Sequence, residues 1–210
     1  MHSAISRSEV SDELVHPGRK LTEQEFIEWS GDKWAEWVDG EVIIMSVNLQ
    51  HAELFAFLFA LLHSFVEDRD IGKILTEPYQ IRFARQKSRR SPDIFFVNHD
   101  TASKHRQQGL EGAADLILEI ISPDSQSRDR REKFLEYEAA GVREYLIVDP
   151  MSKSVEVYAL GKDRKYHQIE ARDGAIRSAV LAGFYLKPEW LWRAKLPKVS
   201  TLLREIKRKR

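Results

Sequence analysis

Residues 116–122 form a dense hydrophobic run in which leucine and isoleucine surround one acidic residue, Glu119. A run that is this apolar and too short for a buried helix is typical of a central strand covered on both faces. Residues 94–97 have the same character, and Asp93 stands directly before them. The pattern therefore predicts two buried strands that each carry a carboxylate, although an unpaired buried carboxylate costs several kcal/mol.

The first half of the chain contains four further predicted elements. A capping box of threonine and glutamate starts a short helix at residues 22–31. An Asp-Gly pair between two β-favouring runs predicts a hairpin at residues 34–45. Apolar positions at helical spacing predict a core helix over residues 50–69, and alternating polarity predicts one strand over residues 73–84.

The second half of the chain predicts a parallel crossover. Residues 98–115 are polar and are expected to form a loop before the buried strand. A helix capped by Asp124 or Ser125 then leads to a strand at residues 144–150, and a strand, helix and strand of these lengths form a right-handed crossover. Short antiparallel strands are expected at residues 155–160, 166–170 and 175–178. The fold class is therefore α/β, with a mixed sheet flanked by helices.

The chain of 210 residues is long enough for one domain with a single large core. Residues 1–19 are expected to be a flexible N-terminal segment and residues 20–195 the folded domain, with Trp190 and its neighbours docked on the core. Residues 196–210 form a basic C-terminal tail, which we expect to be a frayed helix or disordered.

Composition excludes several classes of protein. The 33 basic and 33 acidic residues balance, which argues against a wholly basic binder but leaves room for a local basic groove. The absence of cysteine excludes disulfides and thiolate metal sites. No apolar run approaches the ~20 residues of a membrane span, and the N-terminus lacks an apolar signal core. We therefore expect a cytoplasmic protein that does not contact a membrane.

Three charged residues stand where they could act together. Asp93 opens one buried strand, Glu119 lies inside another, and Lys133 is on the helix that follows. If the two strands are neighbours, the carboxylates can converge at one end of the sheet, where they repel each other unless a divalent cation lies between them. Oxygen ligands of this kind suit Mg²⁺, and a nearby lysine could stabilise charge that develops on a phosphate.

Each of these residues also has a simpler interpretation. Asp93 could belong to a turn at the start of its strand, Glu119 to a structural ion pair, and Lys133 to a solvated helix face. His51 and His63, near the two ends of the long helix, are interpreted as surface or satisfied core residues. An acid–base hydrolase such as a glycosidase has no support beyond the pair of carboxylates itself.

The sequence resembles the Uma-type restriction endonuclease family, part of the PD-(D/E)XK nuclease superfamily. The similarity spans about residues 20 to 192, and the matching pieces are residues 36–41, His51, Pro92-Asp93, residues 119–122, Asp129, Lys133, Tyr137, and residues 141–145 and 148–150. The resemblance implies a restriction-endonuclease-like fold and Mg²⁺-dependent phosphodiester hydrolysis, in which Mn²⁺ can substitute. It also implies that Asp93 and Glu119 are metal ligands, with the Ile120 carbonyl as a third.

The sequence departs from the superfamily pattern at one position. The superfamily places a lysine two residues after the glutamate, but this chain has Ile121 there. Lys133 is the natural substitute, because the long side chain of a helical lysine can reach the same end of the sheet. The resemblance makes Glu36 a further candidate ligand, with a surface position on the hairpin as its alternative, and Asp129 a further candidate for the site.

Nucleic acid is the expected partner, and DNA the expected substrate. A basic stretch leads directly into Asp93, and its members are Arg82, Arg85, Lys87, Arg89 and Arg90. Basic residues beside a metal site can hold phosphates without reading bases, although a solvated basic loop would look the same. A homodimer would allow both strands of a duplex to be cut. The second hypothesis is a catalytically silent module that keeps the fold and binds nucleic acid or a protein partner; the missing lysine favours it, and the retained carboxylates favour the nuclease.

Overall fold

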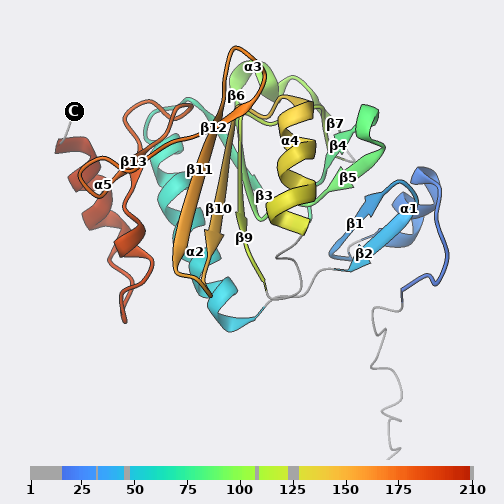
Figure 1. Ribbon diagram of the computed structural model, residues 1–210, viewed down its shortest axis with the longest axis horizontal. Helices are drawn as coiled ribbons and strands as arrows, with labels where there is room; N and C mark the ends of the chain where they lie inside the picture. The colour runs from blue at the N-terminus through green and yellow to red at the C-terminus, as the bar shows by residue number, and fades with distance from the viewer. Residues whose placement is uncertain (1–15, 32, 45–47, 107–108, 123–127, 209–210) are drawn as a thin grey trace, which may run out of the picture.

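The computed structural model describes residues 16–31, 33–44, 48–106, 109–122 and 128–208, without the side chains of residues 128–130 (Figure 1). The helices are α1 (Glu23–Ser30), α2 (Leu49–Glu67), α3 (His99–Ala102), α4 (Phe134–Ala140) and α5 (Val199–Arg208). A π-helical segment, Arg128–Lys133, leads into α4, and 3₁₀ turns occur at Ala84–Gln86 and Pro188–Trp190. These helices flank two six-stranded sheets and a small two-stranded sheet, which confirms the predicted mixed α/β class.

The main sheet holds the two acidic strands side by side. Its order is β12 (Tyr166–Gln168), β11 (Ser154–Leu160), β10 (Glu144–Asp149), β9 (Leu116–Ile120), β6 (Ile94–Asn98) and β3 (Gly72–Thr76). Strands β9 and β10 are parallel and α4 lies between them in the chain, as the crossover prediction requires. The other four strand pairs of this sheet are antiparallel.

The two faces of the main sheet are covered by different helices (Figure 1). Leu118 and the alternate residues of β9, Leu116 and Ile120, pack with the buried face of α2. Ile117 and Ile121 point the other way and pack with Tyr137 of α4. This alternation follows from the two-residue period of a strand, and it places Glu119 on the face that α4 covers.

Among the described helices, α2 is the one whose length and composition would suit a membrane span. From the sequence we expected no membrane span. Helix α2 contacts β3, β9 and α5, and its buried side chains include Leu58, Leu61 and Phe65. These contacts are those of a core helix in a folded domain, as the helical spacing predicts.

The second sheet was not predicted as a unit. Its order is β2 (Glu41–Ile44), β1 (Ala35–Val38), β5 (Ser88–Arg90), β4 (Ile81–Phe83), β8 (Gly109–Glu111) and β7 (His105–Arg106). The predicted hairpin at its edge is confirmed: β1 and β2 are joined by Asp39 and Gly40, whose positive φ angles of 45° and 93° the Asp-Gly pair accommodates.

Residues 73–84 are two strands and not the single strand predicted. The first part is β3 in the main sheet, and the last part is β4 in the second sheet. Pro78 lies between them and cannot donate to a strand ladder, so it ends β3 and lets the chain change sheets. The expected loop at residues 98–115 likewise contains α3 and the short strands β7 and β8.

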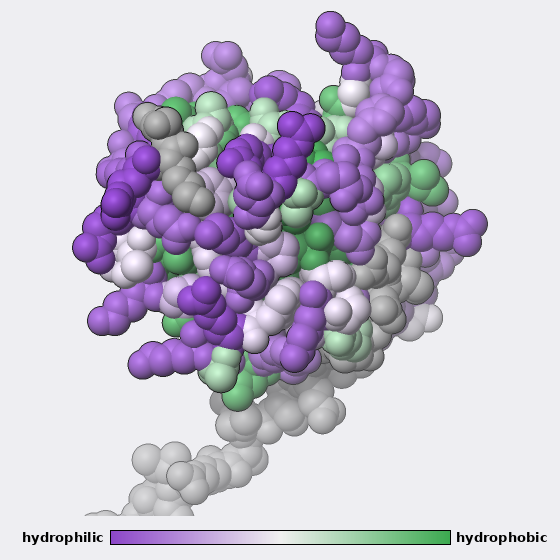
Figure 2. Space-filling model, turned by 60° about the vertical axis from the view of Figure 1, so that its left-hand side comes forward, coloured by the Kyte–Doolittle hydropathy of each residue, from purple (hydrophilic) through white to green (hydrophobic). Residues whose placement is uncertain are grey.

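The C-terminal tail is more ordered than the sequence suggests. Helix α5 contacts α2, and its Leu202 and Ile206 are buried in the core beneath it. The face of the molecule that carries α5 is largely covered by hydrophilic side chains, with hydrophobic patches that are small and separate (Figure 2). Trp190 and Leu191 are buried, which confirms the predicted docking of this segment. The small sheet formed by β13 (Ile176–Arg177) and β14 (Tyr185–Leu186) packs in the same core.

Candidate active site

Asp93 and Glu119 are brought together by the register of two antiparallel strands. Ile94 of β6 pairs with Leu118 of β9, so one step further along each strand places Asp93 opposite Glu119. Directly opposed residues of an antiparallel pair point to the same face, here the face of α4. The two acids are only 3% and 2% exposed, so the predicted convergence at one end of the sheet is what the structure shows.

Asp93 has partners on both carboxylate oxygens. Its Oδ2 accepts a hydrogen bond of 2.6 Å from the backbone N–H of Ile120, and its Oδ1 lies 3.2 Å from Nε2 of His51. His51 comes from the first turn of α2 and is buried. A turn at the start of a strand does not explain these contacts, and His51 belongs to the site although its residue type alone gave no reason to place it there.

Lys133 reaches Glu119 from the helical side. Its Nζ lies 3.0 Å from Glu119 Oε1, and the Tyr137 hydroxyl donates a 2.8 Å hydrogen bond to the same oxygen. Lys133 and Tyr137 are four residues apart, so they share one helix face and meet one acceptor. Lys133 is 1% exposed, and its interpretation as a solvated helix residue is therefore wrong.

Ile121 shows why a lysine is absent from its usual position. Its side chain lies on the α4 face, two residues along the strand from Glu119, and is buried in the apolar cluster with Tyr137. A lysine stem there would compete with the aromatic ring for the same space. The cation instead comes from the helix that covers this face.

Glu36 is a buried member of the same network. Its Oε1 lies 3.1 Å from Lys133 Nζ and accepts from the backbone N–H of Ser91, while its Oε2 accepts from Arg90 at 2.9 Å. Burial raises the pKa of Glu36, but the charges of Lys133 and Arg90 outweigh burial and hold its pKa at about 2. The surface interpretation of Glu36 is wrong, and its contacts tie β1 of the second sheet to the helix that carries Lys133.

Three members of the basic stretch before Asp93 form ion pairs within the protein. Arg90 is buried and lies 2.5 Å from Glu136, in addition to its contact with Glu36. Arg89 and Arg82 both bind Glu23 of α1. These three arginines are therefore ion-pair partners within the protein, and their predicted contacts with phosphates stay a prediction.

Two members of the stretch keep exposed side chains. These are Arg85 and Lys87, with Lys87 Nζ 3.6 Å from Asp39. They remain candidates for contacts with nucleic acid. Asp129 lies in the π-helical segment, but its side chain is outside the described residues.

Glu77 is an acid that sequence reasoning missed. It follows β3, and it lies in the electrostatic field of the site. Burial raises its pKa, and the Asp93 charge raises it further, to about 7, against the lowering effects of His51 and Lys133. Glu77 comes near the site because β3 pairs with β6, and nothing in the sequence indicates that pairing.

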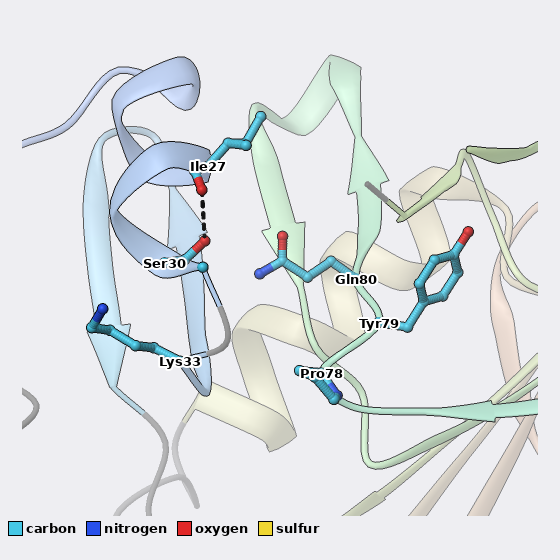
Figure 3. Close-up of a pocket in the computed structure, with 7 residues that line it drawn as sticks. Ile27, Ser30, Lys33, Pro78, Tyr79 and Gln80 are labelled. Atoms are coloured by element: carbon cyan, nitrogen blue, oxygen red, sulfur yellow. Dashed lines mark hydrogen bonds between the residues drawn. The ribbon is translucent and has the colours of Figure 1, made fainter. Parts of the chain in front are cut away.

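A cavity of about 370 Å³ lies between α1 and the segment that joins β3 to β4 (Figure 3). It is lined by Ile27, Ser30, Gly31, Lys33, Pro78, Tyr79 and Gln80. Gln80 crosses beside it and donates a 3.1 Å hydrogen bond to the carbonyl of Ala35. Among the described residues that line the cavity, none carries a carboxylate or an imidazole.

A protein-family model and a solved structure are similar to this chain. The family model Uma2, described as "Putative restriction endonuclease", matches residues 23–189. The chain belongs to the Uma2 family. A crystal structure described as "a putative nuclease belonging to DUF820 from Anabaena variabilis" is similar, with a TM-score of 0.62 and 18% identity, over 75% of this chain and 89% of that chain. No curated protein matches the Uma2 chain. The solved structure shows that this chain shares the fold of that protein, and the Uma2 family is the one described as putative restriction endonucleases.

The residues of this Uma2 chain fit a divalent cation by donor chemistry. Asp93, Glu119 and the Ile120 carbonyl offer only oxygen atoms, which Mg²⁺ prefers. Within the described residues, no three acidic or histidine side chains converge closely enough to form a metal cage. Instead, the His51 ring lies beside Asp93, and Lys133 lies against Glu119 as a counter-charge. The two carboxylates thus supply oxygen donors and already have partners within the protein.

Proposed function

We propose that the protein is a Mg²⁺-dependent endonuclease that hydrolyses phosphodiester bonds of DNA, with Mn²⁺ able to substitute. The observation that carries the proposal is the convergence of Asp93, Glu119 and Lys133 at one buried end of the sheet, with Lys133 Nζ 3.0 Å from Glu119. Membership of the Uma2 family supports the nuclease class.

The three residues would have different roles. Asp93 and Glu119 would hold the cation, and the Ile120 carbonyl would be a third ligand. The chemistry that bound Mg²⁺ supplies is polarisation of a phosphate oxygen and a lowered pKa of water. Lys133 would place a positive charge where charge develops on the phosphate in the transition state.

Other groups keep these side chains in place. The hydroxyl of Tyr137 orients Glu119, and its proton stays in place because burial and the Glu119 charge raise the Tyr137 pKa well above its ordinary value. The backbone N–H of Ile120 fixes one oxygen of Asp93. Positioning of this kind allows a catalytic group to act without reorganisation during the reaction.

One observation favours the alternative of a silent nucleic-acid-binding or protein-binding module. The Lys133 ammonium is buried and lies between two carboxylates, Glu36 and Glu119. If Lys133 only neutralises the buried acids, the protein would keep its fold but would not hydrolyse phosphodiester bonds. Metal binding and cleavage distinguish the two functions.

The test is cleavage of supercoiled plasmid, single-stranded DNA and branched DNA in Mg²⁺ or Mn²⁺, with EDTA as the metal-free control. We compare the native protein with Asp93→Asn, in which the amide can still accept the Ile120 hydrogen bond. We expect Asp93→Asn to lose Mn²⁺ affinity and at least about 10²-fold of the cleavage rate, the scale of removing one electrostatic element of an active site. Equal metal binding and cleavage by the two proteins would reject Asp93 as a ligand. Metal binding without cleavage of any substrate would favour the silent module.

A further inference from the structure

Residues 193–208 carry an excess of positive charge, although the net charge of the whole chain is zero. The segment contains six basic residues and one acidic residue, Glu205. The Glu205 carboxylate already pairs with Lys187, which lies outside the segment, at 2.8 Å. The positive charge is therefore not neutralised within the segment, and it attracts anions wherever the side chains reach solvent.

Four of the six basic side chains are exposed and have no ion-pair partner among the described residues. The other two, Arg193 and Lys207, pair with Glu189 and Asp68. The guanidinium of Arg204 donates only to neutral oxygens of its own helix. The four unpaired cations are Lys195, Lys198, Arg204 and Arg208.

Helix α5 holds part of this charge in a fixed arrangement. Leu202 and Ile206 are buried, and α5 contacts α2, so the opposite side of the helix faces solvent. Arg204 and Arg208 are four residues apart on that exposed side, about 6 Å along the helix axis, and they line one surface groove. Figure 2 shows that the face of the molecule that carries α5 is largely hydrophilic.

The segment begins beside the candidate active site. A cavity of about 540 Å³ lies between the first two turns of α2 and the chain before α5, and its lining includes Gln50, Glu53 and Lys195. Gln50 precedes His51, whose ring lies 3.2 Å from Asp93. Helix α5 then runs along α2 to the C-terminal end of α2 (Figure 1). The unpaired cations thus follow α2 from the turn that carries His51 to its other end.

The backbone of a DNA duplex matches this surface in charge and length. Helix α5 has 10 residues and spans about 15 Å, over which one DNA strand presents about four phosphates. Arginine and lysine side chains neutralise such phosphates without reading bases. Residues 193–208 contain no aromatic residue on which unpaired bases could stack, so a duplex fits this surface better than a single strand.

We propose that residues 193–208 form a second DNA-binding surface, which holds the phosphate backbone of a duplex that is cut at Asp93 and Glu119. The inference rests on the proposed function because it takes DNA as the ligand, and it adds a contact surface outside the basic stretch before Asp93. Since the contacts are with phosphates, the surface binds duplexes of unrelated sequence equally, and its affinity falls as the salt concentration rises.

The test is binding of a short labelled duplex to the full chain in EDTA, measured by fluorescence anisotropy between about 50 and 200 mM salt. The fourfold variant replaces all four unpaired cations by glutamine. We expect it to bind at least about tenfold more weakly than the native protein at about 0.1 M salt. The slope of log K against log salt concentration should be smaller by about 3–4, because each lost phosphate contact removes about 0.9.

The matched control removes the same charge from other elements. It replaces four exposed basic residues by glutamine, and these are Lys73, Lys104, Lys162 and Arg164. Its affinity should stay within about threefold of native, because salt screens charges that lie more than a Debye length from the bound duplex. An equal loss of affinity in the control and the fourfold variant would show a general charge effect and overturn the proposal.

A smaller variant keeps the test decisive if the fourfold variant does not fold. Lys195→Gln/Lys198→Gln changes no residue of α5, and the proposal requires its salt slope to be smaller by about 2. Thermal unfolding shows which variants are folded before binding is measured. Native affinity and slope in the folded variants would overturn the proposal.

The remaining outcomes separate this surface from the proposed function. Cleavage by the native protein and by Asp93→Asn tests the function, whereas binding in EDTA requires neither metal nor cleavage. If the native protein cuts DNA but the fourfold variant binds the duplex normally, the surface is rejected and the function stands. If the native protein binds no duplex, the surface and DNA as the substrate both fall. If the fourfold variant loses binding of poly-glutamate but not of the duplex, the partner is an acidic protein and the proposal is overturned.

Discussion

Lys133 is the residue whose removal tests the buried network most directly. Its ammonium lies 3.1 Å from Glu36 and 3.0 Å from Glu119, and both acids are buried. Lys133→Met keeps most of the side-chain volume but leaves both carboxylates without this cation. Breaking a buried ion pair by removing one partner costs about 3–5 kcal/mol. For a chain of this size, each kcal/mol lowers the melting temperature by about 2–4 °C, so we expect a decrease of about 6–20 °C.

The assay is thermal and urea unfolding of the metal-free protein at pH 8. Lys87→Met is the matched control, because Lys87 is 72% exposed and lies 3.6 Å from Asp39, and its loss should change stability by less than about 0.5 kcal/mol. The double variant Lys133→Met/Glu36→Gln should be more stable than Lys133→Met, since it removes one of the two buried carboxylates that lose the Lys133 cation. The reasoning is refuted if the melting temperature of Lys133→Met lies within about 2 °C of the native value, because a shift that small corresponds to a loss of no more than about 1 kcal/mol. It is also refuted if the double variant is the less stable of the two.

Two more predictions concern pH and the basic stretch. Folding raises the pKa of Glu77 from 4.5 to about 7. Between these two pH values the native state therefore binds more protons than the unfolded state. The contribution of Glu77 to the free energy of unfolding then falls as the pH rises through that window. Urea unfolding at pH 5 and pH 7.5 should therefore show Glu77→Gln gaining stability relative to the metal-free native protein, and an unchanged difference would contradict the shift. Arg85→Met should weaken binding to plasmid DNA with little change in melting temperature. Arg90→Met should lower the melting temperature, because it takes one buried cation from Glu36 and Glu136. Fluorescence anisotropy and thermal unfolding of both variants measure this contrast, which equal behaviour would disprove.

The hydrophobic pattern was enough to predict the buried strands β6, β9 and β10 of the main sheet, but not the order of its strands. The acidic strands β6 and β9 are short, apolar runs, and the crossover through α4 follows from element order and length. The second sheet was missed because its strands β4, β5 and β8 are only three residues long, too short for a period to be seen. The order of α5 was missed because a basic terminal segment gives no sign of the α2 surface on which it packs.

Two residues of the candidate site were predictable because they are charged and stand in strongly apolar segments of the sequence. Asp93 and Glu119 stand out because acids are rare in buried strands. The roles of Glu36 and His51 depend on tertiary register, and nothing local in the sequence distinguishes them from surface residues. The ion pairs of the basic stretch were not predictable for the same reason: Glu23, which binds Arg89, lies 66 residues away in the chain.

The buried ion pairs and the proposed catalytic residues are the same side chains, so the structural and catalytic interpretations of Glu119 do not exclude each other. An acid inserted in an apolar strand needs a counter-charge while the protein folds, and Lys133 supplies it. Glu36 holds Lys133 from the other side, so the ammonium keeps one carboxylate partner if Glu119 turns to a different cation. A lysine shared between two acids can therefore stabilise the fold and still remain beside a metal-bound phosphate. This arrangement explains physically how the cation can come from a helix although Ile121 occupies the strand position where the superfamily has its lysine.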